Sequence, residues 1–263
     1  MLAASDPIPR KRSLSVGDFR RDYVARSRPV ILEGAAADWM ALSRWTPQHL
    51  REQYGGQEVP TLAQSEDGDS DFDPRTGLIP GAMALREFLD QFEGEAPPRM
   101  RVHCILGQQL PSLANDLEVL PHARHGTPVE LHLWISGQRT RSRLHYDHPN
   151  NLLAQVRGTK RVLVIPRRQR RLVYPYPPWS ANPHFSRVDL DHPDYARFPR
   201  LRRVRALGGV IRPGDAIFIP GRAWHYVEAD EPTISVGMRW WPWSWLPLLA
   251  LSSLYKRVRG LAR

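Results

Sequence analysis

Two histidines and one aspartate in this chain have the types and the spacing of a metal site. His145 and Asp147 stand two residues apart, and His225 follows much later. Alternate residues of a strand share one face, so the first two side chains would point the same way. A histidine from a distant strand would complete the set of two imidazoles and one carboxylate that non-haem Fe(II) oxygenases use. His148 has the opposite parity, so we expect it outside this site.

Short strands separated by glycine and proline turns surround these residues. An Arg-Gly-Thr turn at 157–159 stands between two apolar runs, which predicts a hairpin. Pro213 and Gly214 suit the central positions of a type II turn. The runs of β-prone residues are 152–156, 160–165, 216–219 and 233–236. This pattern favours an antiparallel sandwich or jelly roll.

Three helices are expected before the metal-site motif. Ser15 would cap a helix over 16–26. Thr46 and Pro47 form a helix start, with a hydroxyl cap and proline in the first turn. Residues 85–92 carry apolar side chains at helical spacing. A mixed α/β segment over 1–140 should therefore flank the metal-binding half of a barrel at 141–241. With the C-terminal segment 242–263, these parts should form one domain over 1–263.

The combination of these motifs resembles the cupin-like Jumonji C family. The resemblance rests on His-x-Asp, on an asparagine six residues and a lysine fifteen residues after the first histidine, on PGDAIFIP and on the late histidine. It extends from about Pro29 to about Trp241 and is dense from Ser142 onward. Within the family, the chain most resembles the asparaginyl hydroxylase that inhibits hypoxia-inducible factor. It implies a mainly β fold, a double-stranded β-helix with flanking helices, and oxygenation dependent on Fe(II) and 2-oxoglutarate.

The resemblance also implies roles for individual residues. Fe(II) would be held by His145, Asp147 and His225. Lys160 matches the lysine that takes the distal carboxylate of 2-oxoglutarate, and its parity with Val162 and Val164 places it on the barrel interior, where an unpaired charge is costly. Asn151 and Ser142 match positions that hydrogen-bond the cosubstrate.

Four positions depart from the family pattern, two at the cosubstrate site and two on the acceptor side. The family tyrosine that reaches the distal carboxylate aligns with Ile105, and a family asparagine near the metal aligns with Gly237. Each change removes a hydrogen bond worth about 1 kcal/mol. The pair that reads the asparagine side chain in the asparaginyl hydroxylase aligns with His184 and Phe185. Phe185 can neither donate to nor accept from an amide, so asparagine hydroxylation is not expected.

The C-terminal segment 242–263 predicts a short helix. Leu248, Leu251, Tyr255 and Val258 follow helical spacing, and basic residues crowd its end, where the helix dipole favours them. The apolar stripe could pack on the chain's own barrel, form a homodimer, or lie on an anionic membrane surface beside several tryptophans. We expect a homodimer through this helix, as the family's C-terminal helices imply.

Composition narrows the class of protein. The 263 residues carry 37 Lys plus Arg against 27 Asp plus Glu, a net charge of +10. This surface could attract an acidic partner, but no nucleic-acid motif stands out. The single cysteine, Cys104, excludes an internal disulfide and suits a reducing compartment. We expect a cytoplasmic protein, since neither a signal peptide nor an apolar run of transmembrane length is present. The alternating aspartates of 65–76 lack the Gly and Glu positions of a calcium loop.

The reaction itself stays open between several classes. An Fe(II)- and 2-oxoglutarate-dependent hydroxylase acting on a protein or peptide is the expected function. A demethylase would share its metal chemistry, and a small-molecule hydroxylase would differ only in its acceptor. A metal-binding cupin without oxidative activity has the same barrel, because fold alone does not fix function. A lysine placed to hold a carboxylate favours the oxygenase.

Overall fold

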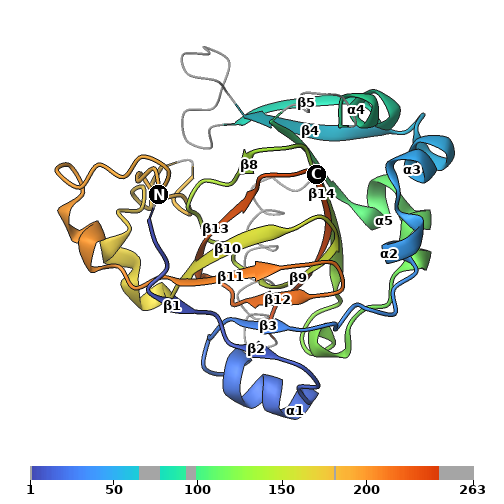
Figure 1. Ribbon diagram of the computed structural model, residues 1–263. Coiled ribbons are helices and arrows are strands. Elements are labelled where there is room, and N and C mark those ends of the chain that lie inside the picture. Colours follow the sequence, from blue (N-terminus) through green and yellow to red (C-terminus); the bar gives the residue numbers. More distant parts are fainter. Residues whose placement is uncertain (1, 65–77, 93–98, 181, 243–263) are drawn as a thin grey trace, which may run out of the picture.

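Two β-sheets face each other in the computed structural model, which describes residues 2–64, 78–92, 99–180 and 182–242 (Figure 1). The smaller sheet has the order β1 (Asp6–Pro7), β11 (Leu207–Ile211), β10 (Lys160–Ile165), β13 (Trp224–Ala229) and β8 (Thr140–Arg141). The larger sheet has the order β2 (Arg10–Lys11), β3 (Val30–Leu32), β12 (Ala216–Ile219), β9 (Asn150–Arg157), β14 (Thr233–Trp240), β7 (Glu130–Ser136), β6 (Met100–Ile105), β4 (Glu58–Gln64) and β5 (Leu78–Ala84). The mainly β jelly roll that the sequence predicted is confirmed.

The amino-terminal part contributes strands to the barrel as well as the flank. Strand β1 pairs in parallel with β11, and β3 pairs with β12. Strand β7 lies beside β14 at the centre of the larger sheet. The expected division at residue 140 therefore falls inside the barrel, because the two sheets need strands from both sides of it.

The predicted hairpin over 152–165 is wrong, although both of its strands exist. Strand β9 pairs with β12 and β14, whereas β10 pairs with β11 and β13 in the opposite sheet. The turn at 157–159 thus carries the chain from one sheet to the other. Two β-prone runs around a glycine turn look the same in sequence whether they pair with each other or with distant strands. Here the distant strands provide the partners.

Gly158 allows the tight turn that connects β9 to β10. Its φ of +66° lies in the left-handed region, and a Cβ there would stand 2.5 Å from the carbonyl oxygen of Pro232. We expect Gly158→Ala to lower the free energy of unfolding by about 2–4 kcal/mol, from backbone strain and overpacking together. Urea denaturation measures it. Gly107→Ala is the control, since nothing lies within 4 Å of a Cβ at Gly107. Equal stability of the two variants would contradict the expectation.

The predicted helices before the metal-site motif are confirmed with small shifts of their ends. Helix α1 (Val16–Phe19) continues as a π-helical turn over Arg20–Val24, and the Ser15 hydroxyl accepts from the Asp18 amide at 3.0 Å. Helix α3 (Pro47–Tyr54) begins after Thr46, whose Oγ1 accepts from the His49 amide. Helix α4 spans Leu85–Phe92 as expected. Two further short helices are α2 (Ala41–Arg44) and α5 (Leu106–Gln109), and 3₁₀ turns cover Pro111–Asp116, Pro121–Ala123, Arg167–Leu172 and Pro199–Arg203.

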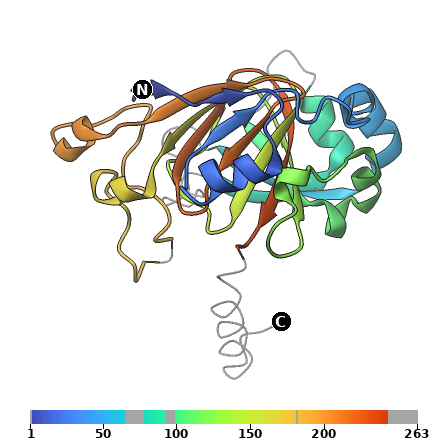
Figure 2. The same ribbon diagram turned by 90° about the horizontal axis from the view of Figure 1, so that it is seen from below.

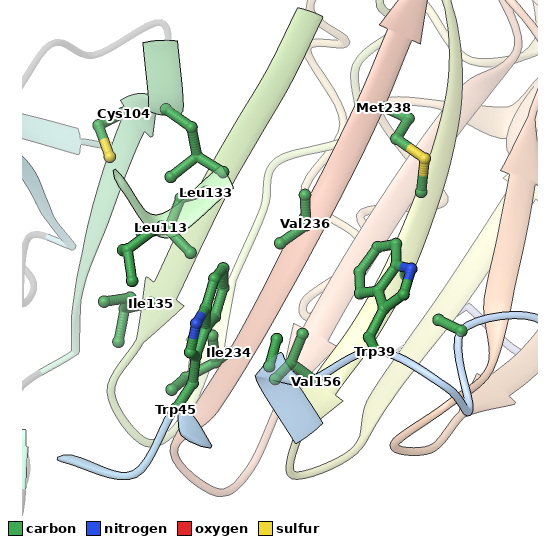
Figure 3. Packing of buried hydrophobic residues seen from close by; sticks show 14 of the residues in the cluster. Trp39, Trp45, Cys104, Leu113, Leu133, Ile135, Val156, Ile234, Val236 and Met238 are labelled. Carbon is green, nitrogen blue, oxygen red and sulfur yellow. The ribbon is translucent and has the colours of Figure 1, made fainter. Parts of the chain in front are cut away.

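The outer face of the larger sheet packs against these helices. Val156, Ile234 and Val236 from β9 and β14 meet Trp39 and Trp45, and all five are buried (Figure 3). Helices α2 to α5 lie along this flank of the barrel (Figure 1). The segment between β10 and β11 lies on the side of the smaller sheet (Figure 2). Its side chains form a separate apolar cluster with those of β10 and β13. Burial of both outer faces anchors the sheets, since apolar burial contributes about 25 cal/mol per Å².

Strand alternation decides which side chains face the space between the sheets. On β9 the outward positions join the helix-facing core, whereas Leu153 belongs to an apolar cluster between the sheets. That cluster also holds Val162, Val164 and Ile217. Leu153 also lines a cavity between the sheets, together with Lys160, which has the same parity as Val162 and Val164 on β10. The space between the sheets is therefore part apolar core and part cavity.

Candidate metal centre and cosubstrate cavity

His145, Asp147 and His225 lie together, as the sequence predicted. Their ligand atoms are all within 4.8 Å of one another, so the three side chains could hold one metal ion. His145 pairs directly with His225 on β13, through two backbone hydrogen bonds of 2.7 and 3.1 Å. Residues that face each other across an antiparallel pair project to the same side. This pairing brings the two imidazoles together with ring centroids 4.2 Å apart. His148 is not part of the group.

Backbone carbonyls fix the tautomers of both histidines. Nδ1 of His145 lies 2.7 Å from the Arg143 carbonyl oxygen, and Nδ1 of His225 lies 3.1 Å from that of Ala223. A carbonyl can only accept, so each Nδ1 carries the proton and each Nε2 keeps its lone pair. Ligating histidines are commonly oriented in this way. Both rings are thus prepared to bind a cation through Nε2.

Burial and neighbouring charges keep the two histidines neutral and Asp147 ionised at neutral pH, which are the states that bind a cation. Burial, together with the neighbouring His225, lowers the pKa of His145 to about 3, so the ring is neutral. Burial would raise the pKa of Asp147, but Arg239 and the two imidazoles bring it down to about 2. Nη2 of Arg239 donates to Oδ2 of Asp147 at 3.0 Å. Arg239 was not anticipated from the sequence, and it holds the carboxylate ionised and in place.

A cavity of about 390 Å³ adjoins the three ligand residues. Its walls come from both sheets and from the segment that follows β10. The lining residues include all six predicted site residues. The full set is Leu62, Arg101, His103, Trp134, Ser136, Thr140, Ser142, His145, Asp147, Asn151, Leu153, Lys160, His184, Phe185, Ile219, His225, Val227, Glu228, Ala229 and Arg239.

Lys160 is the buried cation of this cavity. It is 5% exposed, and its Nζ donates to Oγ of Ser235 at 2.5 Å. No ion pair joins it to a carboxylate within the described ranges. Burial lowers the pKa of Lys160 to about 7, and the charge of Arg101 adds to the shift. An interior ammonium without a counter-ion is costly, so the arrangement suits an anionic ligand.

Asn151 and Ser142 also lie in the cavity. Oδ1 of Asn151 is buried without a partner among the described atoms. Ser142 Oγ accepts from the Val227 amide at 2.8 Å, which leaves the hydroxyl proton for another acceptor. Gly237 gives Asn151 its room, because a Cβ at Gly237 would stand 3.0 Å from that Oδ1. A side chain at position 237 would crowd Asn151, so the glycine that departs from the family pattern leaves space for the Asn151 amide.

The structure changes the interpretation of Ile105. Ile105 pairs with His132 at one end of β6 and does not line the cavity. Arg101, four residues earlier on the same face of the strand, does line it. A cation of β6 thus shares the cavity with Lys160, and its charge lowers the pKa of Lys160.

A chain of hydrogen bonds that the sequence did not reveal enters the same cavity. His132 Nε2 lies 2.6 Å from Glu130 Oε2, and His132 Nδ1 lies 3.0 Å from His103 Nε2. The carboxylate can only accept, so His132 donates to it and accepts from His103. Burial lowers the pKa of His103 to about 3, and the ring stacks on Trp134 with centroids 3.7 Å apart. His103 is a neutral, rigidly held ring in the cavity wall.

His184 and Phe185 form another part of the wall, near the metal ligands. The Phe185 ring stacks on His145 with centroids 5.4 Å apart, and the two residues also form a backbone bridge. His184 packs against Phe185 at 4.6 Å. This wall is aromatic, as the sequence indicated, and it offers the apolar surface that shields a metal site from water.

Comparison with known proteins agrees with the fold and the site. A family model described as a cupin-like domain matches residues 16–244, so the chain belongs to the cupin-like family. It is 27% identical over 248 residues to lysine-specific demethylase 8 of Xenopus tropicalis, covering 92% of this chain and 54% of that protein. It is 26% identical over 248 residues to Jumonji C domain-containing protein 5 of Drosophila melanogaster, covering 89% and 59%. It is 30% identical over 250 residues to the bifunctional peptidase and (3S)-lysyl hydroxylase JMJD7 of Homo sapiens, covering 83% and 78%.

These similarities confirm the Jumonji C resemblance. This chain spans little more than half the length of the first two relatives. Jumonji C proteins are 2-oxoglutarate-dependent oxygenases that use Fe(II), and the His-Asp-His group suits that ion. Among the described residues, no helix is both long and apolar enough to cross a membrane.

Proposed function

We propose that this protein is an Fe(II)- and 2-oxoglutarate-dependent oxygenase that hydroxylates a side chain of a protein or peptide. The observation that carries the proposal is one cavity that holds both the His-Asp-His group and a buried lysine with no carboxylate partner among the described residues. The first suits a divalent cation, and the second suits the far end of a dicarboxylate. A cupin that only binds a metal has no need for that lysine.

The proposed roles follow from the positions of the residues. His145, Asp147 and His225 would hold the iron, and Arg239 orients the carboxylate of Asp147. Lys160 would take the distal carboxylate of 2-oxoglutarate, with Asn151 and Ser142 as further hydrogen-bonding groups. The bound iron and cosubstrate supply the oxidising chemistry, with succinate and CO₂ as coproducts. The chain contributes positioning and an aromatic wall that limits water.

Lysine modification is the chemistry named for the relatives. One is called a demethylase and another a lysyl hydroxylase. Both reactions begin by oxidising a carbon beside or within a lysine side chain, so the choice between them depends on the acceptor and not on the iron. We propose a polypeptide acceptor on this basis. The aromatic pair His184 and Phe185 does not favour asparagine, and the likeness to the asparaginyl hydroxylase stays a prediction.

Succinate formation tests the class of enzyme before any acceptor is known. Purified protein with Fe(II), 2-oxoglutarate and oxygen is expected to form succinate slowly without an acceptor. Anaerobic titration should first produce the visible charge-transfer band of Fe(II) bound to 2-oxoglutarate. Zn(II)-loaded protein is the control and should form none. Iron-loaded protein that binds 2-oxoglutarate and yields no succinate would favour a non-oxidative cupin.

Mass spectrometry then addresses the acceptor. Host proteins incubated with the active enzyme should gain 16 Da, or lose 14 Da per methyl group if demethylation is the reaction. Protein with alanine at His145 provides the comparison. Products confined to small metabolites would favour the small-molecule hydroxylase.

The remaining expectations are kept as proposals. We propose one domain over 1–263 and a cytoplasmic location, the latter because Cys104 is the single cysteine. The homodimer was expected through the helix at 242–263, and this segment lies outside the described residues apart from Pro242. Light scattering of the full chain beside a chain ending at Pro247 tests the dimer.

A further inference from the structure

Two cations line the same cavity from opposite sheets, and one of them, Lys160, is buried whereas Arg101 is partly exposed. Lys160 is on β10 of the smaller sheet, and Arg101 is on β6 of the larger sheet. The charge of Arg101 lowers the pKa of Lys160, so the two groups interact electrostatically. Both line the cavity next to the metal ligands.

Neither cation has a carboxylate partner within the described part of the chain. Nη2 of Arg101 donates to the Arg141 carbonyl oxygen at 2.8 Å, and its Nε is buried without a partner. Lys160 donates to the hydroxyl of Ser235. The other carboxylate in the cavity wall, Glu228, pairs with Arg161 and Arg141 instead. Desolvation of two like charges next to each other costs free energy, which an anionic ligand would recover.

The guanidinium of Arg101 can bind a carboxylate directionally, which the ammonium of Lys160 cannot. Its donors form a planar fork that matches a carboxylate, while the ammonium acts as a point charge. The buried Nε and the ammonium of Lys160 leave donors for one anion between the two sheets. The anion position between Arg101 and Lys160 is distinct from the metal-binding group. A ligand that spans the two would suit them best with a metal-binding group at one end and a carboxylate at the other.

We propose that Arg101 is a second cationic residue for the distal carboxylate of 2-oxoglutarate, sharing it with Lys160. This inference rests on the proposed function and adds a residue to its cosubstrate site. The carboxylate would accept from Arg101 and Lys160 together, in place of the tyrosine hydroxyl that the sequence alignment sought at Ile105. Arg101 would then select ligands with a distal acid over ligands of the same length without one.

Calorimetry of anaerobic, Mn(II)-loaded protein tests this role without turnover. The two ligands are 2-oxoglutarate and 2-oxopentanoate, which has the same chain length and lacks the distal carboxylate. Arg101→Gln should weaken 2-oxoglutarate at least about tenfold, because it removes a charged hydrogen bond, and should leave 2-oxopentanoate within about twofold. Arg157→Gln removes the same charge from an exposed position at the end of β9 and should change neither affinity.

Each outcome decides the proposal. Unchanged 2-oxoglutarate affinity in a folded Arg101→Gln protein would show that Arg101 only supports the Arg141 carbonyl. Equal weakening of both ligands would mean general damage to the cavity, which also overturns the role. If the Gln variant does not fold, Arg101→Lys keeps the charge without the fork and should weaken 2-oxoglutarate alone. Failure of the unaltered protein to bind 2-oxoglutarate would instead refute the proposed function itself.

Discussion

Alanine at Asp147 or at His145 is expected to abolish succinate formation and to weaken Fe(II) binding on the order of a thousandfold. Loss of a group that merely orients a ligand typically costs 10–100-fold in metal affinity or activity, and loss of a ligand costs more. Two consequences add up at Asp147. The cation loses its one anionic ligand, and Arg239 is left as an uncompensated charge in the site. The positive charge of Arg239 would then repel the metal ion.

His148→Ala is the matched control for this prediction. It removes an imidazole next to the motif that lies outside the ligand group and packs against Tyr146 and Trp241. We expect its metal affinity and its succinate yield to stay close to those of the unaltered protein. Metal binding is measured by titration under nitrogen, and succinate by mass spectrometry. Retention of both by Asp147→Ala would place the metal elsewhere.

The group of three candidate metal ligands could be predicted because it depends on a short spacing and on one long-range pairing. The His-x-Asp spacing brings His145 and Asp147 together, although His145 forms only an isolated bridge and Asp147 lies outside any strand. The interior parity of Lys160 follows from Val162 and Val164 on the same strand. His225 needed a distant contact, which the family resemblance supplied and the backbone bridge to His145 now explains.

Other features depend on sheet register, which local patterns do not encode. The turn at Gly158 separates two genuine strands, and nothing in 150–165 reveals that they belong to different sheets. The pairing of β6 with β7 sets His103 beside His132 and places Arg101 in the cavity. Alternation along 100–105 does show that Arg101, His103 and Ile105 share a face, but only the register tells which of them reaches Lys160.

Lys160→Met is expected to weaken 2-oxoglutarate binding by roughly 100- to 4,000-fold. Removing one partner of a desolvated charge pair typically costs roughly 3–5 kcal/mol, and each 1.4 kcal/mol is a factor of ten. Methionine keeps most of the volume of the lysine stem, so the cavity should hold its shape. Fe(II) affinity should change little, since Lys160 is not a ligand. Equal affinity for 2-oxoglutarate in the variant would show that Lys160 does not face the cosubstrate.

The same substitution should stabilise the protein when metal and cosubstrate are absent. The pKa of Lys160 in the fold is about 7, below its ordinary value of 10.5, so between these values the unfolded chain holds one more proton. Unfolding free energy therefore rises with pH across this window, and at pH 7 and below the fold bears the full cost of a buried ammonium beside Arg101. The neighbouring strands do not neutralise this charge. Lys160 faces Ile211 on β11, and the carboxylate of Glu228 on β13 is paired with Arg161 and Arg141. The advantage of Lys160→Met in urea denaturation should thus be largest near pH 6 and fade toward pH 10. A variant less stable than the unaltered protein at pH 6 would mean that Lys160 supports the fold, and that the buried charge is not held there for a ligand.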